Sequence, residues 1–128
     1  MSATGRLSGK VAIVTGGGSG IGRSIVDVYA ANGARVLAVD LPGRDWQSHF
    51  KGNAAVVCLE QDITAKDAPD NVMNACVKAF GGLDILVNNA GIAIGAQFEE
   101  TTDEQWDRIL GINVTSIFRI SKAAVPQL

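Results

Sequence analysis

Residues 11–22 read Val-Ala-Ile-Val-Thr-Gly-Gly-Gly-Ser-Gly-Ile-Gly, and a helical pattern follows at once. The opening apolar, largely β-branched run is typical of a buried strand. A strand that ends in a glycine-rich turn and opens a helix forms an anion site, because the helix N-terminus presents unpaired N–H groups and a partial positive charge. The glycines let a pyrophosphate approach the backbone closely. This stretch therefore predicts a nucleotide-binding protein.

The glycines of the turn have the spacing T-G-x-x-x-G-x-G, through Gly16, Gly20 and Gly22. No register fits G-x-G-x-x-G, and the turn is not a P-loop, since no Gly-Lys-Ser/Thr follows it. Taken alone, such a turn could join a strand to a helix without binding anything. The strand before it, the helix after it and an acidic residue, Asp40, 18 positions beyond Gly22 favour dinucleotide binding.

The composition indicates a globular domain and excludes several classes of protein. The chain has 128 residues, 47% of them hydrophobic, and we expect one domain, residues 1–128. A net charge of −2 gives no basic surface for nucleic acid or an acidic membrane. No run approaches the roughly 18 apolar residues of a membrane span, and residues 1–10 do not resemble a signal peptide. Cys58 and Cys76 lack metal-ligand spacing and His49 is the only histidine, so we expect reduced thiols, a cytoplasmic protein and no metal site.

Strand and helix patterns alternate along the chain. Short β-branched runs predict four strands, at residues 10–15, 35–40, 54–60 and 83–87. The β-α order implies right-handed crossovers and a doubly wound parallel sheet with helices on both faces. In the first helix, the inward face is expected to carry Ile21, Ile25, Val28 and Tyr29. Residues 41–53 are expected to form a loop with a short helical turn near Trp46.

Asp40 closes the second predicted strand, a position that faces the adenosine ribose in dinucleotide-binding folds. A carboxylate there can accept hydrogen bonds from both ribose hydroxyls. It would also repel a 2′-phosphate by roughly 1–4 kcal/mol at contact distance. Since the glycine loop contains no lysine or arginine, we expect NAD rather than NADP. Arg44 is the nearest cation and could complicate this preference, and a solvated aspartate at the end of a strand is the alternative interpretation.

Polar residues also follow the third and fourth predicted strands. Asp62 could border an adenine or cap the next turn, and the sequence favours neither. Residues 88–91, Asn-Asn-Ala-Gly, suit the close approach of a ligand, although an asparagine-rich turn would look the same. In the last helix, Asn113 falls on an apolar stripe made of Trp106, Leu110, Ile117 and Ile120. It is either a core asparagine with satisfied hydrogen bonds or one that interrupts the helix ladder and binds a water facing the site.

Together these residues resemble the short-chain dehydrogenase/reductase family over nearly the whole chain, residues 7–128. The resemblance implies a Rossmann fold of strand order 3-2-1-4-5-6-7, here reaching only the fourth strand and the helix after it. It implies NAD(P)-dependent hydride transfer between a secondary alcohol and a ketone. It also implies a set of cofactor-binding residues. These are Gly16, Gly18, Ser19, Gly20 and Ile21 at the pyrophosphate and adjoining ribose, Asp40 at the adenosine ribose, Asp62 and Ile63 at the adenine, and Asn89, Ala90 and Gly91 near the centre of the dinucleotide.

The resemblance assigns Asn113 to the family's catalytic Asn-Ser-Tyr-Lys set, where the asparagine supports a proton-relay water. Family members carry the serine and a Tyr-x-x-x-Lys further along, whereas this chain ends 15 residues beyond Asn113. Its only tyrosine, Tyr29, is in the first helix, and Lys122 has no tyrosine four residues before it. We therefore expect the 128 residues to be the N-terminal half of a dehydrogenase and to be inactive alone.

Two other interpretations are open. A non-catalytic module could bind NAD weakly or pair with a full-length partner or a second copy through the last helix, through which family members usually assemble. A methyltransferase that uses S-adenosylmethionine also places a glycine loop after the first strand and an acid after the second. The Asn-Asn-Ala-Gly segment and Asn113 argue against the methyltransferase.

Overall fold

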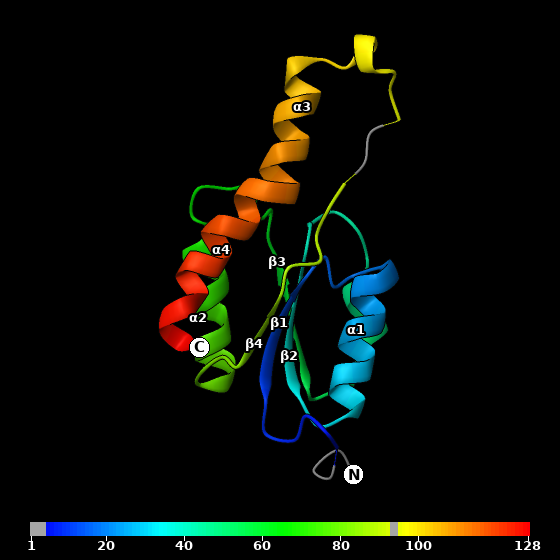
Figure 1. The fold of residues 1–128 in the computed structure, drawn as a ribbon. Coiled ribbons are helices and arrows are strands. Elements are labelled where there is room, and N and C mark those ends of the chain that lie inside the picture. Colours follow the sequence, from blue (N-terminus) through cyan, green and yellow to red (C-terminus); the bar gives the residue numbers. More distant parts are fainter. Residues whose placement is uncertain (1–4, 93–94) are drawn as a thin grey trace.

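The computed structural model describes residues 5–92 and 95–128, and it contains a four-stranded parallel sheet (Figure 1). The strand order is β3-β2-β1-β4, which confirms the predicted topology. The strands begin up to two residues later than predicted, at β1 Val11–Thr15, β2 Arg35–Asp40, β3 Val56–Glu60 and β4 Ile85–Val87. Among the described strands, β4 pairs only with β1, so it forms one edge of the sheet.

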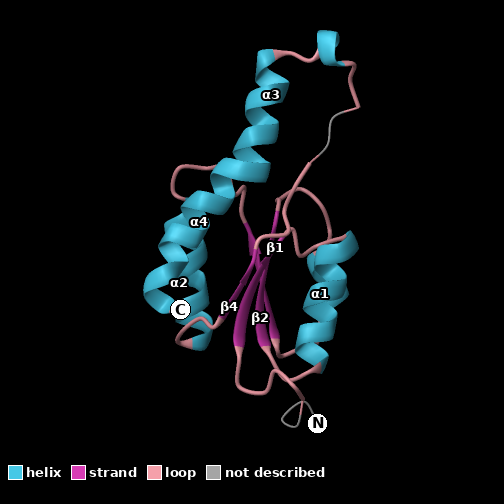
Figure 2. Cartoon of the chain, in the orientation of Figure 1, coloured by secondary structure: helices cyan, strands magenta, loops and turns pink. Residues whose placement is uncertain are grey.

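Helices cover both faces of this sheet (Figure 2). One face packs against α1, Gly20–Ala31, and the other against α2, Ala68–Phe80, and α4, Ser116–Ala124. Alternate residues of β1 point to opposite faces, so Ala12 and Val14 join the core under α1 while Ile13 joins the core under α2 and α4. Burial on both faces explains why the strand sequences are almost continuously apolar.

The inward face of α1 is only partly the predicted one, since Ile25 and Tyr29 pack against the core under this helix but Ile21 and Val28 do not. Gly22, Val26 and Ala30 are buried, whereas Ile21 is 75% exposed and Val28 is 57% exposed. The reason is the close approach of the helix to the glycine loop. A Cβ atom on Gly22 would lie 2.0 Å from the Gly16 carbonyl oxygen, so a residue without a side chain must face inward there.

The last helical segment contains an interruption. A capping box between Thr102 and Gln105 begins α3, Asp103–Leu110, and a π-helical turn, η4 Gly111–Thr115, joins it to α4. The expected apolar stripe is only partly confirmed. Ile120 is buried and Leu110 is half-buried, but Trp106 is 56% exposed and Ile117 is also exposed. The other buried residues are Ile112, Ser116 and Ala124. A π turn holds one extra residue, so a stripe counted with a period of 3.6 residues loses its register there.

Three short 3₁₀ helices complete the described structure. They are η2, Gln47–Phe50, η3, Phe98–Glu100, and η5, Val125–Gln127. The first of them confirms the helical turn expected near Trp46. In residues 5–92 and 95–128, no helix combines the length and the apolar character needed to cross a membrane.

The contact at Gly22 gives a test of this packing. Alanine normally favours a helix over glycine by about 1 kcal/mol. At Gly22, however, the added Cβ would meet the Gly16 carbonyl and the Asn89 amide, so we expect Gly22→Ala to lower the free energy of unfolding by about 1–3 kcal/mol. Urea denaturation measures this difference. Gly82→Ala is the matched control, because nothing lies within 4 Å of a Cβ at Gly82, and an equal loss in both variants would contradict the packing argument.

Candidate nucleotide-binding site

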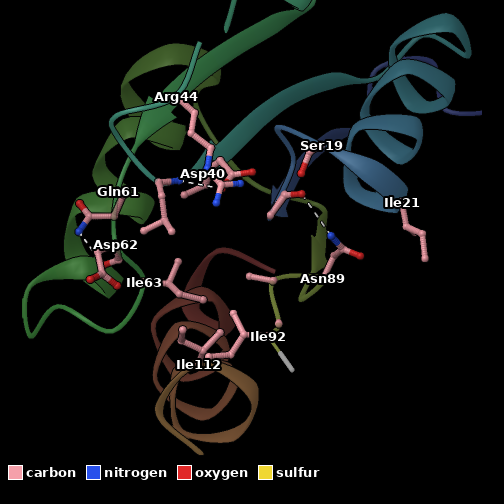
Figure 3. Close-up of a pocket in the computed structure, with 15 residues that line it drawn as sticks. Ser19, Ile21, Asp40, Arg44, Gln61, Asp62, Ile63, Asn89, Ile92 and Ile112 are labelled. Carbon is pink, nitrogen blue, oxygen red and sulfur yellow. Dashed lines mark hydrogen bonds between the residues drawn. The ribbon is translucent and has the colours of Figure 1, made fainter. Parts of the chain in front are cut away.

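A cavity of about 310 Å³ lies at the carboxyl ends of the parallel strands (Figure 3). Open α/β sheets bind ligands at this edge, where strand order changes direction on either side of β1. The wall is formed by the end of β2, the loops after all four strands, the start of α1 and one residue of the π turn. The lining residues are Gly16, Ser19, Ile21, Val39, Asp40, Leu41, Arg44, Gln61, Asp62, Ile63, Asn89, Ala90, Gly91, Ile92 and Ile112.

Most of the residues expected from the sequence meet at this cavity. Nine of them line it: Gly16, Ser19, Ile21, Asp40, Asp62, Ile63, Asn89, Ala90 and Gly91. Ile21 lies at the margin with its side chain directed outward (Figure 3). Gly18, Gly20 and Asn113 are not lining residues. Gly20 turns the chain with φ of +55°, a conformation that favours glycine, and Gly18 and Asn113 hold neighbouring lining residues in place.

The Asp40 carboxylate is fixed by two backbone groups. The Gly18 N–H donates to Oδ2 at 2.8 Å, and the Leu41 N–H donates to Oδ1 at 2.7 Å. A Cβ on Gly18 would lie only 2.7 Å from Oδ2, so the glycine is what allows the loop to approach the acid. A carboxylate can accept further hydrogen bonds at both oxygens, and Asp40 is therefore held in place while still able to receive hydroxyl donors.

Thr15 joins the ends of β1 and β4, a role that the sequence analysis did not assign. Its side chain is buried, and Oγ1 accepts hydrogen bonds from the backbone N–H groups of Asn89 and Ala90, each at 3.1 Å. The hydroxyl also donates to the Val87 carbonyl at 3.4 Å. Asn89 adds a second connection, because its Nδ2 donates to the Gly16 carbonyl at 3.3 Å. The sequence did offer one sign of this role, since Thr15 places a hydroxyl at the end of an otherwise apolar strand.

Asp62 caps the next turn, as one of the two interpretations expected, and it also lies in the cavity wall. It lines the cavity, and its Oδ1 also accepts hydrogen bonds from the Thr64 hydroxyl at 2.7 Å and the Thr64 N–H at 2.9 Å. These hydrogen bonds, the one from the hydroxyl most of all, lower the pKa of the Asp62 carboxyl below its ordinary value of 3.8. The residue is therefore a cap of the turn and a charged element of the wall at once.

Asn113 connects the π turn to the loop after β4. Its Oδ1 accepts the Ile92 N–H at 2.9 Å, and its Nδ2 donates to the Ile92 carbonyl at 2.9 Å. Gly91 passes close to this amide, since a Cβ there would lie 3.2 Å from Oδ1. Asn113 thus lies where a π turn interrupts the α-helical hydrogen-bond pattern, and both polar groups of its side chain have backbone partners. Its two hydrogen bonds hold Gly91 and Ile92 in the wall of the cavity.

Several lining residues were missed by the sequence analysis or given no role in the wall. Arg44 comes from the loop after β2, and in Figure 3 its side chain is directed toward Asp40. Ile92 and Ile112 stand opposite that pair and, with Ile63, form an apolar side of the cavity (Figure 3). Ile112 could have been recognised only with the π turn in view, because that turn decides which residues of the last helical segment face the sheet.

The cysteines lie outside the cavity wall. Both are unpaired, and burial raises the pKa of each thiol, that of Cys76 to about 11 with a smaller contribution from the Asp84 carboxylate. Such thiols are poor nucleophiles because so little thiolate is present near neutral pH. Within the described residues, no group of three or more His, Cys, Asp or Glu side chains is arranged to hold a metal ion.

The hydroxyl of Thr15 gives a stability test of the β1–β4 connection. Thr15→Val keeps the shape of the side chain but leaves the N–H groups of Asn89 and Ala90 without this acceptor. We expect the free energy of unfolding to fall by about 1–3 kcal/mol, measured by urea denaturation. Thr15→Ser retains the hydroxyl and should lose less. A larger loss in the serine variant would show that the methyl group, not the hydroxyl, matters.

Asp62 gives a pH test. Because its pKa is lower in the folded state, its stabilising contribution is complete above about pH 5 and disappears as the pH falls through 3.8 and the lower folded value. We expect wild type to lose stability more steeply than Asp62→Asn between about pH 5 and pH 2, with the two curves converging at the acid end. Urea midpoints across this range test it. Asp45→Asn, which removes an exposed charge, should follow the wild-type curve.

Comparison with known proteins agrees with this geometry. Residues 10–128 match the short chain dehydrogenase family. The chain is 39% identical to 2,5-dichloro-2,5-cyclohexadiene-1,4-diol dehydrogenase LinX of Sphingobium indicum, with 96% of this chain and 51% of the relative covered. It is 40% identical to cis-toluene dihydrodiol dehydrogenase of Pseudomonas putida, with 96% and 47% covered. The chain therefore spans about half the length of these curated relatives.

Solved structures of the same kind superpose closely. A short chain dehydrogenase from Burkholderia cenocepacia in complex with NADP matches with a TM-score of 0.90 and 37% identity, over 96% of this chain and 52% of that one. The 3-ketoacyl-(acyl-carrier-protein) reductase from Brucella melitensis complexed with NADH matches with a TM-score of 0.88 and 35% identity, over 94% and 51%. On the family match, the fold and the sheet order, this chain belongs to the short chain dehydrogenase family.

Proposed function

We propose that this chain is the dinucleotide-binding half of an NAD-dependent dehydrogenase that transfers hydride between a secondary alcohol and a ketone. One observation carries the proposal. The Asp40 carboxylate lies in the wall of the cavity and is fixed by the N–H of Gly18, inside the glycine loop. The acid and the anion-binding turn are thus held together at the point where a dinucleotide would place its adenosine ribose and its pyrophosphate.

The residues present fit a dinucleotide. A Cβ at Gly20 would meet nothing within 4 Å, so the start of α1 is open, and no side-chain cap occupies it. In this proposal the pyrophosphate lies against the loop of Gly16, Gly18, Ser19, Gly20 and Ile21. Asp40 receives the adenosine ribose, Asp62 and Ile63 border the adenine, and Asn89, Ala90 and Gly91 border the centre of the dinucleotide. When bound, a nicotinamide cofactor supplies the hydride chemistry, and these residues bind and orient it.

The preference for NAD rests on charge. Asp40 presents a carboxylate that would repel a 2′-phosphate by roughly 1–4 kcal/mol. Arg44 lines the same cavity and opposes this effect in part. Of the similar solved structures, one is in complex with NADH and another with NADP, so family membership alone does not select the cofactor. Asp40 is the reason to favour NAD.

For catalysis, the described part of the cavity offers positioning, and neither a tyrosine nor a lysine lines it to act as a general acid. Asn113 holds the cavity wall and would support a relay water, as the family resemblance implies. Among the described residues, the cavity is lined by no tyrosine and no lysine, and Tyr29 packs beside the core under α1. Proton transfer to or from an alcohol needs a group with a pKa near the working pH. We propose that residues 1–128 bind cofactor as an incomplete domain and do not turn over a substrate alone; turnover of a panel of secondary alcohols by the purified chain would contradict this.

A second candidate is a binding module that pairs with another protein chain of the same family. Exposed apolar side chains on α3, η4, α4 and η5 favour it, and they are Trp106, Val114, Ile117, Phe118, Val125 and Leu128. Exposed apolar side chains that gather in one part of a chain often mark a surface that another chain covers. Light scattering after size-exclusion chromatography separates the two states. A monomer at high concentration would count against this candidate, whereas a dimer would support it without excluding cofactor binding.

Removal of the Asp40 charge tests the proposed function. Asp40→Asn keeps the size of the side chain and removes the repulsion of a 2′-phosphate. We expect the ratio of the Kd for NADP to the Kd for NAD to fall by about tenfold or more, since each 1.4 kcal/mol is a factor of about ten. Calorimetric titration with both cofactors measures it. Asp45→Asn makes the same charge change on an exposed side chain of the loop after β2. It should leave the ratio of the two Kd values unaltered. An unchanged ratio in Asp40→Asn would contradict the proposal.

A further inference from the structure

Trp46 lies behind the Asp40 carboxylate and outside the cavity. Its side chain is only 6% exposed and belongs to the apolar core between the sheet and α1. Phe50 packs against it edge-to-face, with the ring centres 6.5 Å apart. Since Trp46 is not a lining residue, any effect that it has on a ligand must pass through its neighbours.

Four contacts connect Trp46 and Asp40 in a closed ring. The indole Nε1–H donates to the Leu41 carbonyl at 3.0 Å, and the Leu41 N–H donates to Asp40 Oδ1 at 2.7 Å. Asp40 Oδ2 accepts the Gly18 N–H at 2.8 Å. Gly18 closes the ring, because a Cβ there would lie 2.7 Å from Oδ2 and 2.7 Å from the indole Cγ. Each member of the ring therefore limits the movement of the next.

The segment after β2, residues 41–50, is also attached to α1 at its far end. His49 Nε2 lies 2.8 Å from Asp27 Oδ2, and the His49 ring packs against Phe50 with ring centres 4.8 Å apart. The near end, residues 41–46, is fixed by the indole hydrogen bond to Leu41. This near end also carries Arg44, the cation in the cavity wall. The position of the Asp40 carboxylate thus depends on Trp46 through Leu41 and Gly18.

We propose that Trp46 is a positioning residue that fixes the Asp40 carboxylate and so sets the discrimination between a ribose with a free 2′-hydroxyl and one with a 2′-phosphate. The inference rests on the proposed dinucleotide site. A carboxylate held at both oxygens cannot rotate away from an incoming phosphate. When the indole donor is lost, the loop of residues 41–46 relaxes and Asp40 can turn aside from the phosphate.

Calorimetric titration of Trp46→Phe with NAD and with NADP tests this inference. Phenylalanine keeps an aromatic ring and removes the N–H donor. We expect the Kd for NAD to rise about three- to tenfold, which is the range for one lost hydrogen bond, while NADP binding is unchanged or tighter. Trp106→Phe, at the exposed tryptophan of α3, is the control and should alter neither Kd. Equal weakening of both cofactors would show that Trp46 only supports packing, and would overturn the inference.

A double-mutant cycle with Asp40→Asn shows whether Trp46 acts through the acid. If it does, Trp46→Phe leaves the ratio of the Kd for NADP to the Kd for NAD unchanged once Asp40 has been replaced. Effects of the two substitutions on this ratio that simply add would overturn the inference. If the ratio of the Kd for NADP to the Kd for NAD changes in Asp40→Asn but not in Trp46→Phe, the role of Trp46 is refuted and the proposed role of Asp40 stands. Failure of wild type to bind NAD refutes the proposed function and this inference together. Circular dichroism checks folding. If Trp46→Phe does not fold, Phe50→Leu removes the aromatic side chain that packs against Trp46 and is judged by the same ratio of Kd values.

Discussion

The carbonyl of Gly16 is the point on which the rest of the structure depends. It lies between the Asn89 amide, which donates to it at 3.3 Å, and the Cα of Gly22, where a Cβ would come within 2.0 Å. The strand end, the helix start and the end of β4 can meet only because Gly22 has no side chain. This single close approach brings the loops after β1 and β4 to the same cavity, and it decides which face of α1 turns inward.

Around that contact, side chains serve mainly to hold backbone in place. The Thr15 hydroxyl binds two N–H groups of the loop after β4, and the Asn113 amide binds both backbone groups of Ile92. Asp40 and Asp62 accept backbone N–H groups and keep oxygen atoms at the cavity. The wall is therefore largely preorganised, which reduces the free energy that a ligand would otherwise spend on ordering loops.

The features that could be predicted from the sequence are those that depend on residues close together along the chain. The glycine turn, the four apolar runs and the acid at the end of β2 each act within a few residues of chain, and strand order and the meeting of these loops follow from them. Thr15 was missed because its partners lie 74 and 75 residues away. The predicted buried faces of α1 and of the last helical segment were only partly right. A backbone contact at Gly22 and a π turn at Asn113 shift which residues face inward, and a count of apolar residues along the sequence does not show either feature.

We propose that the four loops at the carboxyl edge of the sheet form one dinucleotide site, and a nitrogen–proton correlation NMR titration of the 128-residue chain with NAD tests this directly. We expect chemical-shift changes only at the amides of the glycine turn, of Leu41, of the turn at Asp62 and Ile63, and of Ala90 to Ile92. All of these changes should saturate with one Kd. Shifts restricted to the exposed face of α3 and α4, or no shifts in a folded chain, would contradict it.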